Sequence, residues 1–411
     1  MILSPEIQKT LRHYKQEVDA ELQSLLNWWM LHIPDKNNGG FYGEINQVNI
    51  PQIDQPNGLV LQSRLLWTFA TTFANTGEKK YLDFADAVYN YLIERFSDPI
   101  YGGMYWSVGR DGIPVATKKQ AYGLAFAIYG LSAYYEASSN EAALAKAIEL
   151  YHCIEKYCSD KIQGGYVECL QRDWSVIEDV RLSDKDQNAI KSMNTHLHII
   201  EAYTKLYTVS KNDSVKNAIH ALLNCFEKHI IHPDTLQQKL FFQANWQPTS
   251  SDISYGHDIE AAWLLHESAM VLGDPLVIQK FEKIAVAMAQ VVADNTAEDG
   301  ALYNEFNALT LHLNKGKDWW PQAEAMVGFL NAYELTQQQS FLDHSLASWN
   351  LIKKYFIDHI HGEWYWGYDE TGKLIKREKA GFWKCPYHNS RACMEVSRRI
   401  THLLNSYNHE G

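Results

Sequence analysis

Three histidines have positions that favour acid–base chemistry in one shared site. His198, His257 and His388 each lie near the start of a stretch whose apolar residues follow a helical period. An imidazole has an unperturbed pKa of about 6.5, so it can accept and donate protons at neutral pH. A set of such groups suits reversible proton transfer, in which one group accepts a proton and another donates one.

The segment Gly381–Val396, with the sequence G-F-W-K-C-P-Y-H-N-S-R-A-C-M-E-V, gathers an indole, an imidazole and a guanidinium. Its glycine and proline predict a loop that holds Trp383, followed by a helix. His388 and Arg391 then lie one turn apart near the start of that helix, with Arg391 in a supporting role. These groups suit a pocket that transforms a sugar. Taken alone, a surface loop before an ordinary amphipathic helix would show the same pattern.

Two histidines lie close together in the sequence K-S-M-N-T-H-L-H-I-I-E-A-Y. Asn194 and His198 are four residues apart and share a helical face, whereas His196 is rotated by about 200° from His198. We therefore expect His198 to face the site and His196 to pack elsewhere, which makes them a poor metal-binding pair. No H-E-x-x-H motif supports a metal site either, and we expect none.

Further candidates for binding or orienting a substrate also lie near helix starts. Glu260 follows His257 by three residues, so it could orient the imidazole or bind a sugar hydroxyl. Trp320 precedes Glu324 by four residues on one helical face. Each of these side chains would fit an ordinary core position by itself, but their recurrence at one end of successive helices favours a joint site. Two earlier helices add Arg64 and Tyr122.

These residue types favour an isomerisation. Removing the proton next to a sugar aldehyde gives an enediolate, which Arg64 and Asn194 would stabilise by charge and hydrogen bonds. The sequence has no G-x-x-x-x-G-K-[ST] motif and no strand–G-x-G-x-x-G–helix unit, so we expect a redox-neutral reaction without a cofactor. Glu260 and Glu324 leave glycoside hydrolysis open, since glycosidases use two carboxyl groups.

A glycine–aromatic motif recurs at intervals of 62 or 63 residues, with one gap about twice as long. We place a degenerate copy, K-L-F-F-Q, at 239–243 inside that gap. Short polar turns with the same period separate stretches of helical periodicity, which predicts six helical hairpins in tandem. The clear copies of the motif lie at 38–42, 101–105, 163–166, 299–303 and 361–365.

The hairpins predict an all-α fold. Short turns join each even-numbered helix to the next odd-numbered one, and the longer links carry the glycine–aromatic motifs as short β-excursions. An open solenoid normally has atypical polar ends, but both terminal units here carry the motif, so we expect a closed (α/α)6 barrel as a single catalytic domain over 1–411. The even-numbered helices should line its inside. The predicted helices span 5–30, 58–76, 79–95, 118–138, 141–158, 188–209, 213–230, 254–273, 276–293, 320–337, 340–356 and 387–406.

The composition of the chain limits the classes of molecule that the protein is expected to bind. The net charge of −12 argues against nucleic acid or an anionic membrane, since both require basic patches. No apolar run is long enough for a transmembrane helix, and the N-terminus shows no signal peptide. The 6 cysteines lack disulfide-type spacing, so we expect free thiols in a cytoplasmic protein, a monomer or weak dimer that acts on a small sugar.

Five segments give the chain a recognisable resemblance across almost its whole length. They are L-S-D-K-D (182–186), K-S-M-N-T-H-L-H (191–198), S-Y-G-H-D-I-E-A (254–261), W-W-P-Q-A-E-A (319–325) and W-K-C-P-Y-H-N-S-R (383–391). In this order they resemble the cellobiose 2-epimerases of the N-acylglucosamine 2-epimerase superfamily. The resemblance implies an (α/α)6 barrel that reversibly epimerises C2 of the reducing-end glucose of β-1,4-linked disaccharides. Cellobiose would become glucosyl-mannose, and lactose would become epilactose.

The resemblance also implies roles for particular residues. His257 and His388 match the family's acid/base pair, which moves the C2 proton between the two faces of a cis-enediolate. His198 matches a third histidine, implicated in ring opening or in holding the open-chain sugar. The other matches are Arg64 and Asn194 at the reducing-end oxygens, Glu260 as an orienting carboxylate, Trp320 and Trp383 as stacking indoles, and Ser183 and Asp186 near the non-reducing glucose. Tyr122 and Glu324 complete the candidate substrate-binding residues.

Rival functions remain open at this point. The nearest is a 2-epimerase for free D-mannose or D-glucose, which would use the same scaffold and histidines. An N-acylglucosamine 2-epimerase is a second rival from the same superfamily. An (α/α)6 glycoside hydrolase and a helical-repeat interaction protein come from other classes.

Overall fold

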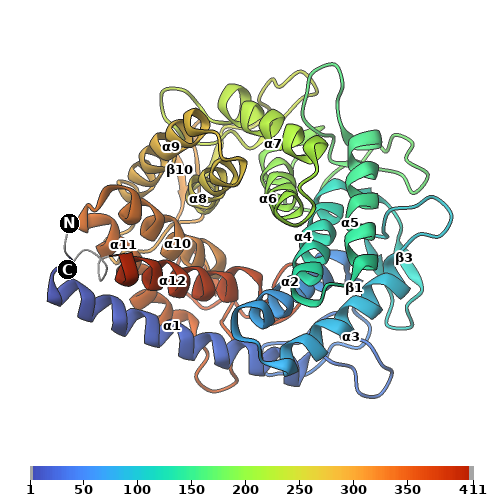
Figure 1. Ribbon diagram of the computed structural model, residues 1–411, viewed down its shortest axis with the longest axis horizontal. Helices are drawn as coiled ribbons and strands as arrows, with labels where there is room; N and C mark the ends of the chain where they lie inside the picture. Colours follow the sequence, from blue (N-terminus) through green and yellow to red (C-terminus); the bar gives the residue numbers. More distant parts are fainter. Residues whose placement is uncertain (1–2, 407–411) are drawn as a thin grey trace.

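Twelve α-helices within residues 3–406, the part of the chain that this computed structural model describes, form two concentric rings (Figure 1). Residues 1–2 and 407–411 of the predicted single domain lie outside the described part. The inner ring consists of α2 (Leu59–Thr76), α4 (Ala121–Ser138), α6 (Met193–Ser210), α8 (Tyr255–Leu272), α10 (Trp319–Thr336) and α12 (Tyr387–Ser406). The outer ring consists of α1 (Pro5–His32), α3 (Lys79–Phe96), α5 (Glu141–Cys153), α7 (Asp213–Cys225), α9 (Pro275–Ala293) and α11 (Gln339–Leu351).

The ring is closed. Each inner helix packs on the next, and α12 packs on α2 as well as on α1, so the two ends of the chain complete the sixth hairpin. This confirms the predicted (α/α)6 barrel and excludes the open solenoid. Three outer helices end in one π-helical turn each, at Ile154–Cys158, Phe226–Ile230 and Ile352–Phe356.

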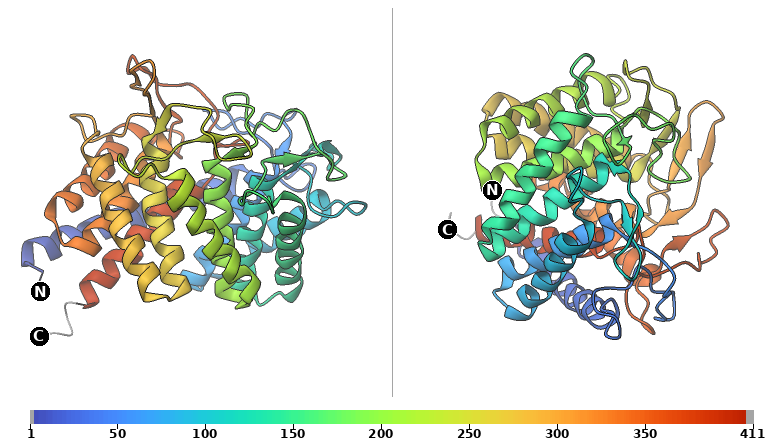
Figure 2. Two further views of the ribbon diagram at one scale, coloured as in Figure 1. Left: turned by 90° about the horizontal axis from the view of Figure 1, so that it is seen from above. Right: turned by 90° about the vertical axis from the view of Figure 1, so that its right-hand side faces the viewer.

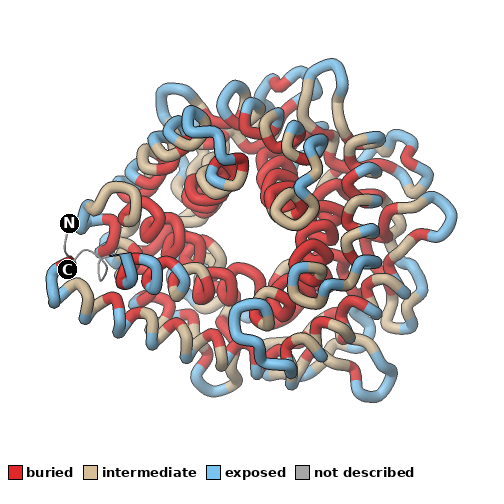
Figure 3. The backbone as a smooth tube through the Cα atoms, in the orientation of Figure 1, coloured by how far each residue is buried: buried red, intermediate tan, exposed pale blue. Residues whose placement is uncertain are grey.

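Burial separates the two rings as the amphipathic pattern requires (Figure 3). The inner helix α4 is buried without a break from Ala121 to Tyr134, because it packs on neighbours all round. The outer helix α3 buries a single stripe, which includes Tyr81, Ala85 and Val88. None of the helices in the described chain combines the length and apolar character needed to cross a membrane. All six cysteines are free thiols, as expected.

The turns between paired helices are short and capped. Gly77 ends α2 in the left-handed conformation with φ 70°, a geometry that glycine adopts without strain. Asn140 and Asn212 begin α5 and α7, and their side chains accept hydrogen bonds from backbone N–H groups of the first turn. These turns lie at the predicted positions.

The glycine–aromatic loops tie each hairpin to the start of the next. At the 101–105 loop, the Asp98 carboxylate accepts hydrogen bonds from the backbone N–H groups of Ile100 and Tyr101. Lys119, two residues before α4, donates to Asp98 at 2.9 Å and to the Gly102 carbonyl at 2.8 Å. The same buried arrangement recurs as Lys191 with Asp160 and as Lys379 with Asp358. The pairs of Lys119 and Lys191 tie the starts of α4 and α6 to the preceding loop, and Lys379 ties the segment that leads into α12.

The degenerate copy predicted at 239–243 is wrong. The equivalent turn lies at 232–236, where Leu236 has φ 59° and takes the place that Gly102, with φ 72°, takes in the 101–105 loop. The flanking residues Ile231 and Gln238 form the same kind of bridge that Ser97 and Met104 form around the 101–105 loop. A leucine in the glycine position hid this copy from a motif search.

Short strands form a belt around the starts of the inner helices. The strand before each inner helix pairs with a strand in the following long loop, and a bridge between Ile45 and Ala380 closes the belt. Helices α4 and α6 therefore begin later than predicted, because the residues just before them form these paired strands. The strands are β1 (Asn57–Gly58), β2 (Ser107–Val108), β3 (Pro114–Ala116), β4 (Lys119–Gln120), β5 (Cys169–Leu170), β6 (Lys191–Ser192), β7 (Phe241–Phe242), β8 (Asp252–Ser254), β9 (Glu305–Asn307), β10 (His312–Asn314), β11 (Lys317–Asp318) and β12 (Gly367–Tyr368).

Candidate active site

The long loops gather on one side of the barrel, at the end where the inner helices begin (Figure 2). Each inner helix places a polar or aromatic candidate in its first two turns at this end, as predicted. In order around the ring these are Arg64, Tyr122, His198, His257, Trp320 and His388.

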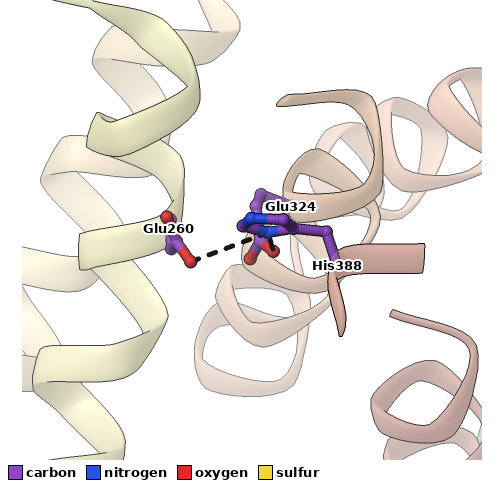
Figure 4. Close-up of side chains that lie close together, drawn as sticks. All are labelled: Glu260, Glu324 and His388. Carbon is purple, nitrogen blue, oxygen red and sulfur yellow. Dashed lines mark hydrogen bonds and ion pairs between the residues drawn. The ribbon is translucent and has the colours of Figure 1, made fainter. Parts of the chain in front are cut away.

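His388 lies among carboxylates from two other helices (Figure 4). Its Nδ1 is 2.7 Å from Glu324 Oε1 and 3.9 Å from Glu260 Oε1. The ring is buried, and burial together with the charges of Arg64 and Arg391 lowers the pKa of His388 well below its ordinary value. The imidazole is therefore held neutral, with Glu324 next to it to stabilise a proton when one arrives.

Arg391 joins the carboxylates into one network. Its Nη2 donates to Glu260 Oε1 at 2.6 Å and to Glu324 Oε1 at 2.7 Å, and its Nη1 donates to Glu201 and to the Tyr387 hydroxyl. Burial and the neighbouring Glu324 charge raise the pKa of Glu260 to about 8. One guanidinium thus holds three buried acidic groups from α6, α8 and α10.

The same network occupies the position where a metal ion would fit. Ligand atoms of Glu260, Glu324 and His388 lie within 4.8 Å of one another, which is a suitable set for a metal. Both carboxylates already accept from Arg391 through their Oε1 atoms, so the guanidinium supplies the positive charge here. This occupancy argues against a metal at that position.

His198 faces the site and His196 does not, as the helical geometry predicts. His198 Nδ1 is 2.9 Å from Glu201 Oε2, and its ring packs 5.0 Å from that of Tyr122. His196 donates from Nδ1 to the Ser192 carbonyl at 2.7 Å and accepts the Tyr166 N–H at Nε2. Both ring nitrogens of His196 are engaged in these hydrogen bonds, so of the two histidines only His198 is available for proton transfer.

His257 rests on a neutral partner. Its Nδ1 is 2.8 Å from the hydroxyl of Ser254, the residue that precedes α8. Burial, with the His198 imidazole nearby, lowers the pKa of His257 to about 3. Of the two roles expected of Glu260, orienting this imidazole is wrong, because Glu260 contacts Arg391 and His388 instead. Binding a sugar hydroxyl stays a prediction.

Aromatic rings frame the three histidines. Trp320 lies next to two of them, with its ring centroid 4.6 Å from that of His257 and 5.5 Å from that of His388. Trp383 contacts Tyr122 and Trp106, each with ring centroids 6.0 Å apart. Both tryptophans are half-buried, so each keeps apolar surface available for the face of a sugar.

Arg64 enters the site from α2 through aromatic rings. Its Nη2 donates to the Tyr122 hydroxyl at 2.9 Å, and its guanidinium lies 4.1 Å from the Phe126 ring and 4.5 Å from the Tyr387 ring. These cation–π contacts hold a buried positive charge beside the histidines. A fixed charge in this position suits an oxyanion that develops on a sugar.

Ser183, Asp186 and Asn194 lie together beside the start of α6. The Ser183 backbone N–H and hydroxyl both donate to Asp186, at 2.8 and 2.7 Å. Asp186 and Asn194 line a cavity of about 20 Å³, and the Asn194 Oδ1 atom has no hydrogen-bond partner among the described residues. An unpaired buried acceptor is available for a hydroxyl donor.

Three residues that hold the histidines in place were not among the candidates expected from the sequence. Glu201 and Ser254 are the partners of His198 and His257, and the Tyr387 hydroxyl donates to Glu201. Glu201 follows His198 by three residues, the same spacing that drew attention to Glu260. The signal was present, but spacing alone could not decide which acidic residue faces which imidazole.

The fold and the site together define a helical barrel whose inner helix starts surround neutral imidazoles, a buried arginine and half-buried indoles. Residues 40–392 match the family N-acylglucosamine 2-epimerase (GlcNAc 2-epimerase). The chain therefore belongs to this family, and the resemblance proposed from the five sequence segments is confirmed.

Similar proteins cover almost the whole chain. It is 42% identical to a cellobiose 2-epimerase of Bacteroides fragilis, over 93% of this chain and 98% of that protein. The structure of cellobiose 2-epimerase from Spirochaeta thermophila is similar with a TM-score of 0.91 and 38% identity, over 98% of this chain and 100% of that one. A D-mannose isomerase structure shares the fold with a TM-score of 0.83 at 20% identity, over 94% of this chain and 98% of that one.

Proposed function

We propose that this protein is an isomerase that epimerises C2 of the reducing-end glucose of β-1,4-linked disaccharides. Cellobiose becomes glucosyl-mannose, and lactose becomes epilactose. The similarity to cellobiose 2-epimerases at 42% and 38% identity supports this substrate class. The observation that carries the chemistry is that the rings of His257 and His388 both lie next to Trp320, with centroids 4.6 and 5.5 Å from that of the indole, so a sugar stacked on Trp320 would have two proton-transfer groups close to it.

The reaction begins with an open-chain sugar, which His198 helps to form or hold. One imidazole of the His257 and His388 pair, in its neutral form, accepts the C2 proton. The lowered pKa values of both groups favour this neutral form at pH 7. The electrons move onto the C1 oxygen to give an enediolate, and Arg64 and Asn194 stabilise it.

Rotation about C2–C3 then turns the opposite face of the enediolate towards the second imidazole, which acts as the acid only after it has taken up a proton against its lowered pKa. That group donates its proton to C2 and completes the inversion. Glu324 lies 2.7 Å from His388 Nδ1, so it stabilises the protonated form of His388 whenever that residue holds the proton. The direction of the reaction decides which imidazole begins as the base.

The carboxylates argue against hydrolysis. A glycosidase needs two carboxyl groups that flank the scissile bond. One protonates the glycosidic oxygen, and the other activates a water molecule or attacks the sugar. Glu260 and Glu324 are both fully buried and both bonded to Arg391, so neither is free to reach a glycosidic oxygen.

The test is incubation in D2O with cellobiose, lactose, mannose and N-acetylmannosamine, each followed by proton NMR. We expect mannose-type anomeric signals, deuterium at C2 and an intact disaccharide with the first two sugars. Turnover of mannose alone would assign the monosaccharide branch, and turnover of N-acetylmannosamine alone the N-acyl branch. Release of glucose would mean hydrolysis, and no change with any sugar would refute an epimerase.

A further inference from the structure

Glu201 touches three groups of the site through its two carboxylate oxygens. The Oε2 atom faces His198 Nδ1 at 2.9 Å, while Oε1 accepts the Tyr387 hydroxyl and Nη1 of Arg391. The side chain is only 3% exposed. Every bond that this carboxylate accepts therefore comes from the protein.

We propose that Glu201 is a positioning residue that fixes the tautomer of His198, with the proton on Nδ1 and the lone pair on Nε2. An ionised carboxylate can only accept hydrogen bonds, so the ring nitrogen next to it must carry the proton. The neutral ring then has an unprotonated Nε2. Because His198 has its role in ring opening only under the proposed epimerase function, the catalytic part of this inference rests on that function.

Arg391 and Tyr387 keep Glu201 ionised. Burial alone would raise the pKa of Glu201, but the charge of Arg391 and the hydrogen bonds from His198 and Tyr387 outweigh it and lower the pKa to about 2. The tautomer of His198 is then the same across the working range of the enzyme. This differs from His257, whose partner is the Ser254 hydroxyl, because a hydroxyl can either donate or accept.

Replacing Glu201 by glutamine should reverse the tautomer. The Oε1 position meets the Arg391 N–H, which has no acceptor capacity, and the Tyr387 O–H. The amide oxygen must stay there, so the amide NH2 takes the Oε2 position and donates to His198 Nδ1. That nitrogen must then lose its proton to Nε2. A side chain of almost the same shape thus delivers the opposite proton arrangement.

The experiment is nitrogen NMR of the full-length chain labelled with ¹⁵N-histidine, with the His198 signals identified by their loss in His198→Asn. In the wild-type protein we expect His198 Nδ1 protonated and Nε2 bare. In Glu201→Gln we expect the reverse, together with a fall in epimerase kcat of about 100-fold or more, since a wrong tautomer removes proton transfer.

Glu155→Gln is the matched control. Glu155 accepts the hydroxyls of Tyr166 and Tyr203 outside the site, at 2.6 and 3.0 Å, so it changes a similar carboxylate without touching a histidine. We expect it to leave both the His198 signals and kcat unchanged.

Each outcome decides the proposal. A wild-type His198 with a bare Nδ1 overturns it even if Glu201→Gln does not fold, and so does a tautomer that stays unchanged in a folded Glu201→Gln. A reversed tautomer with full activity would overturn the catalytic part alone. If the wild-type protein epimerises no sugar, the proposed function fails, while the tautomer result still stands or falls by itself.

Discussion

Replacing Arg391 by methionine tests whether one guanidinium holds the site together. The Arg391 side chain is 2% exposed and donates to Glu201, Glu260 and Glu324. Methionine fills similar space but leaves these buried carboxylates without their shared cation. Removal of one partner from a buried ion pair costs about 3–5 kcal/mol, and with three carboxylates affected we expect a loss of about 5 kcal/mol in the free energy of unfolding.

The loss should depend on pH. Without the guanidinium, the pKa of Glu260, already raised to about 8 by burial and by Glu324, rises further, and Glu201 loses the charge that keeps its pKa at about 2. A carboxyl group whose folded pKa exceeds its unfolded value of about 4.3 binds more protons in the folded state. Its contribution to stability then falls as pH rises through that window. Arg391→Met should therefore lose less stability at pH 5 than at pH 8.

The assay is urea denaturation followed by tryptophan fluorescence at pH 5, 7 and 8. Arg398→Met on the same helix is the control, because Arg398 is 59% exposed and pairs with Glu395 at 2.6 Å. Glu395 is 19% exposed but keeps a second cation, Arg399 at 3.3 Å, so we expect loss of the exposed Arg398 to cost only what a surface ion pair contributes, about 0–1 kcal/mol. Equal denaturation midpoints for the two variants at pH 8, with unchanged slopes, would refute the reasoning.

Three further predictions follow from the same geometry. His257→Ala and His388→Ala should each lower kcat about 100-fold to 10,000-fold in steady-state assays, with unchanged circular dichroism; retained activity would remove that residue from the acid/base pair. Trp383→Ala should raise KM more than it lowers kcat, and a normal KM would argue against stacking. Burial opposes ionisation of Asp358, but Lys379 lowers its pKa to about 2, so its stabilisation is present above about pH 4 and fades as pH falls through 2. Asp358→Asn should hence destabilise the fold at pH 7 and much less near pH 2.5 in thermal unfolding.

The helices were predictable from the sequence because their signals are local. An apolar stripe at helical spacing, a polar turn and a cap such as Asn140 are all contained within a few residues. The regularly spaced loops also made the closed ring of helices predictable, because six similar hairpins have few ways to pack. The missed loop at 232–236 shows the limit, because Leu236 adopts the left-handed conformation without the glycine that a motif search requires.

The sequence by itself determined the barrel, the end at which the inner helices carry polar groups, and the choice of His198 over His196. Only the tertiary structure decided the partners of those groups. Arg391 meets acidic groups 190, 131 and 67 residues away in the chain. Such contacts depend on ring closure and on the rotation of each helix about its axis. Rotating a helix by a fraction of a turn moves a side chain from one neighbour to another. Spacing along the sequence therefore cannot decide that Glu260 accepts from Arg391 while Ser254 is the hydrogen-bond partner of His257.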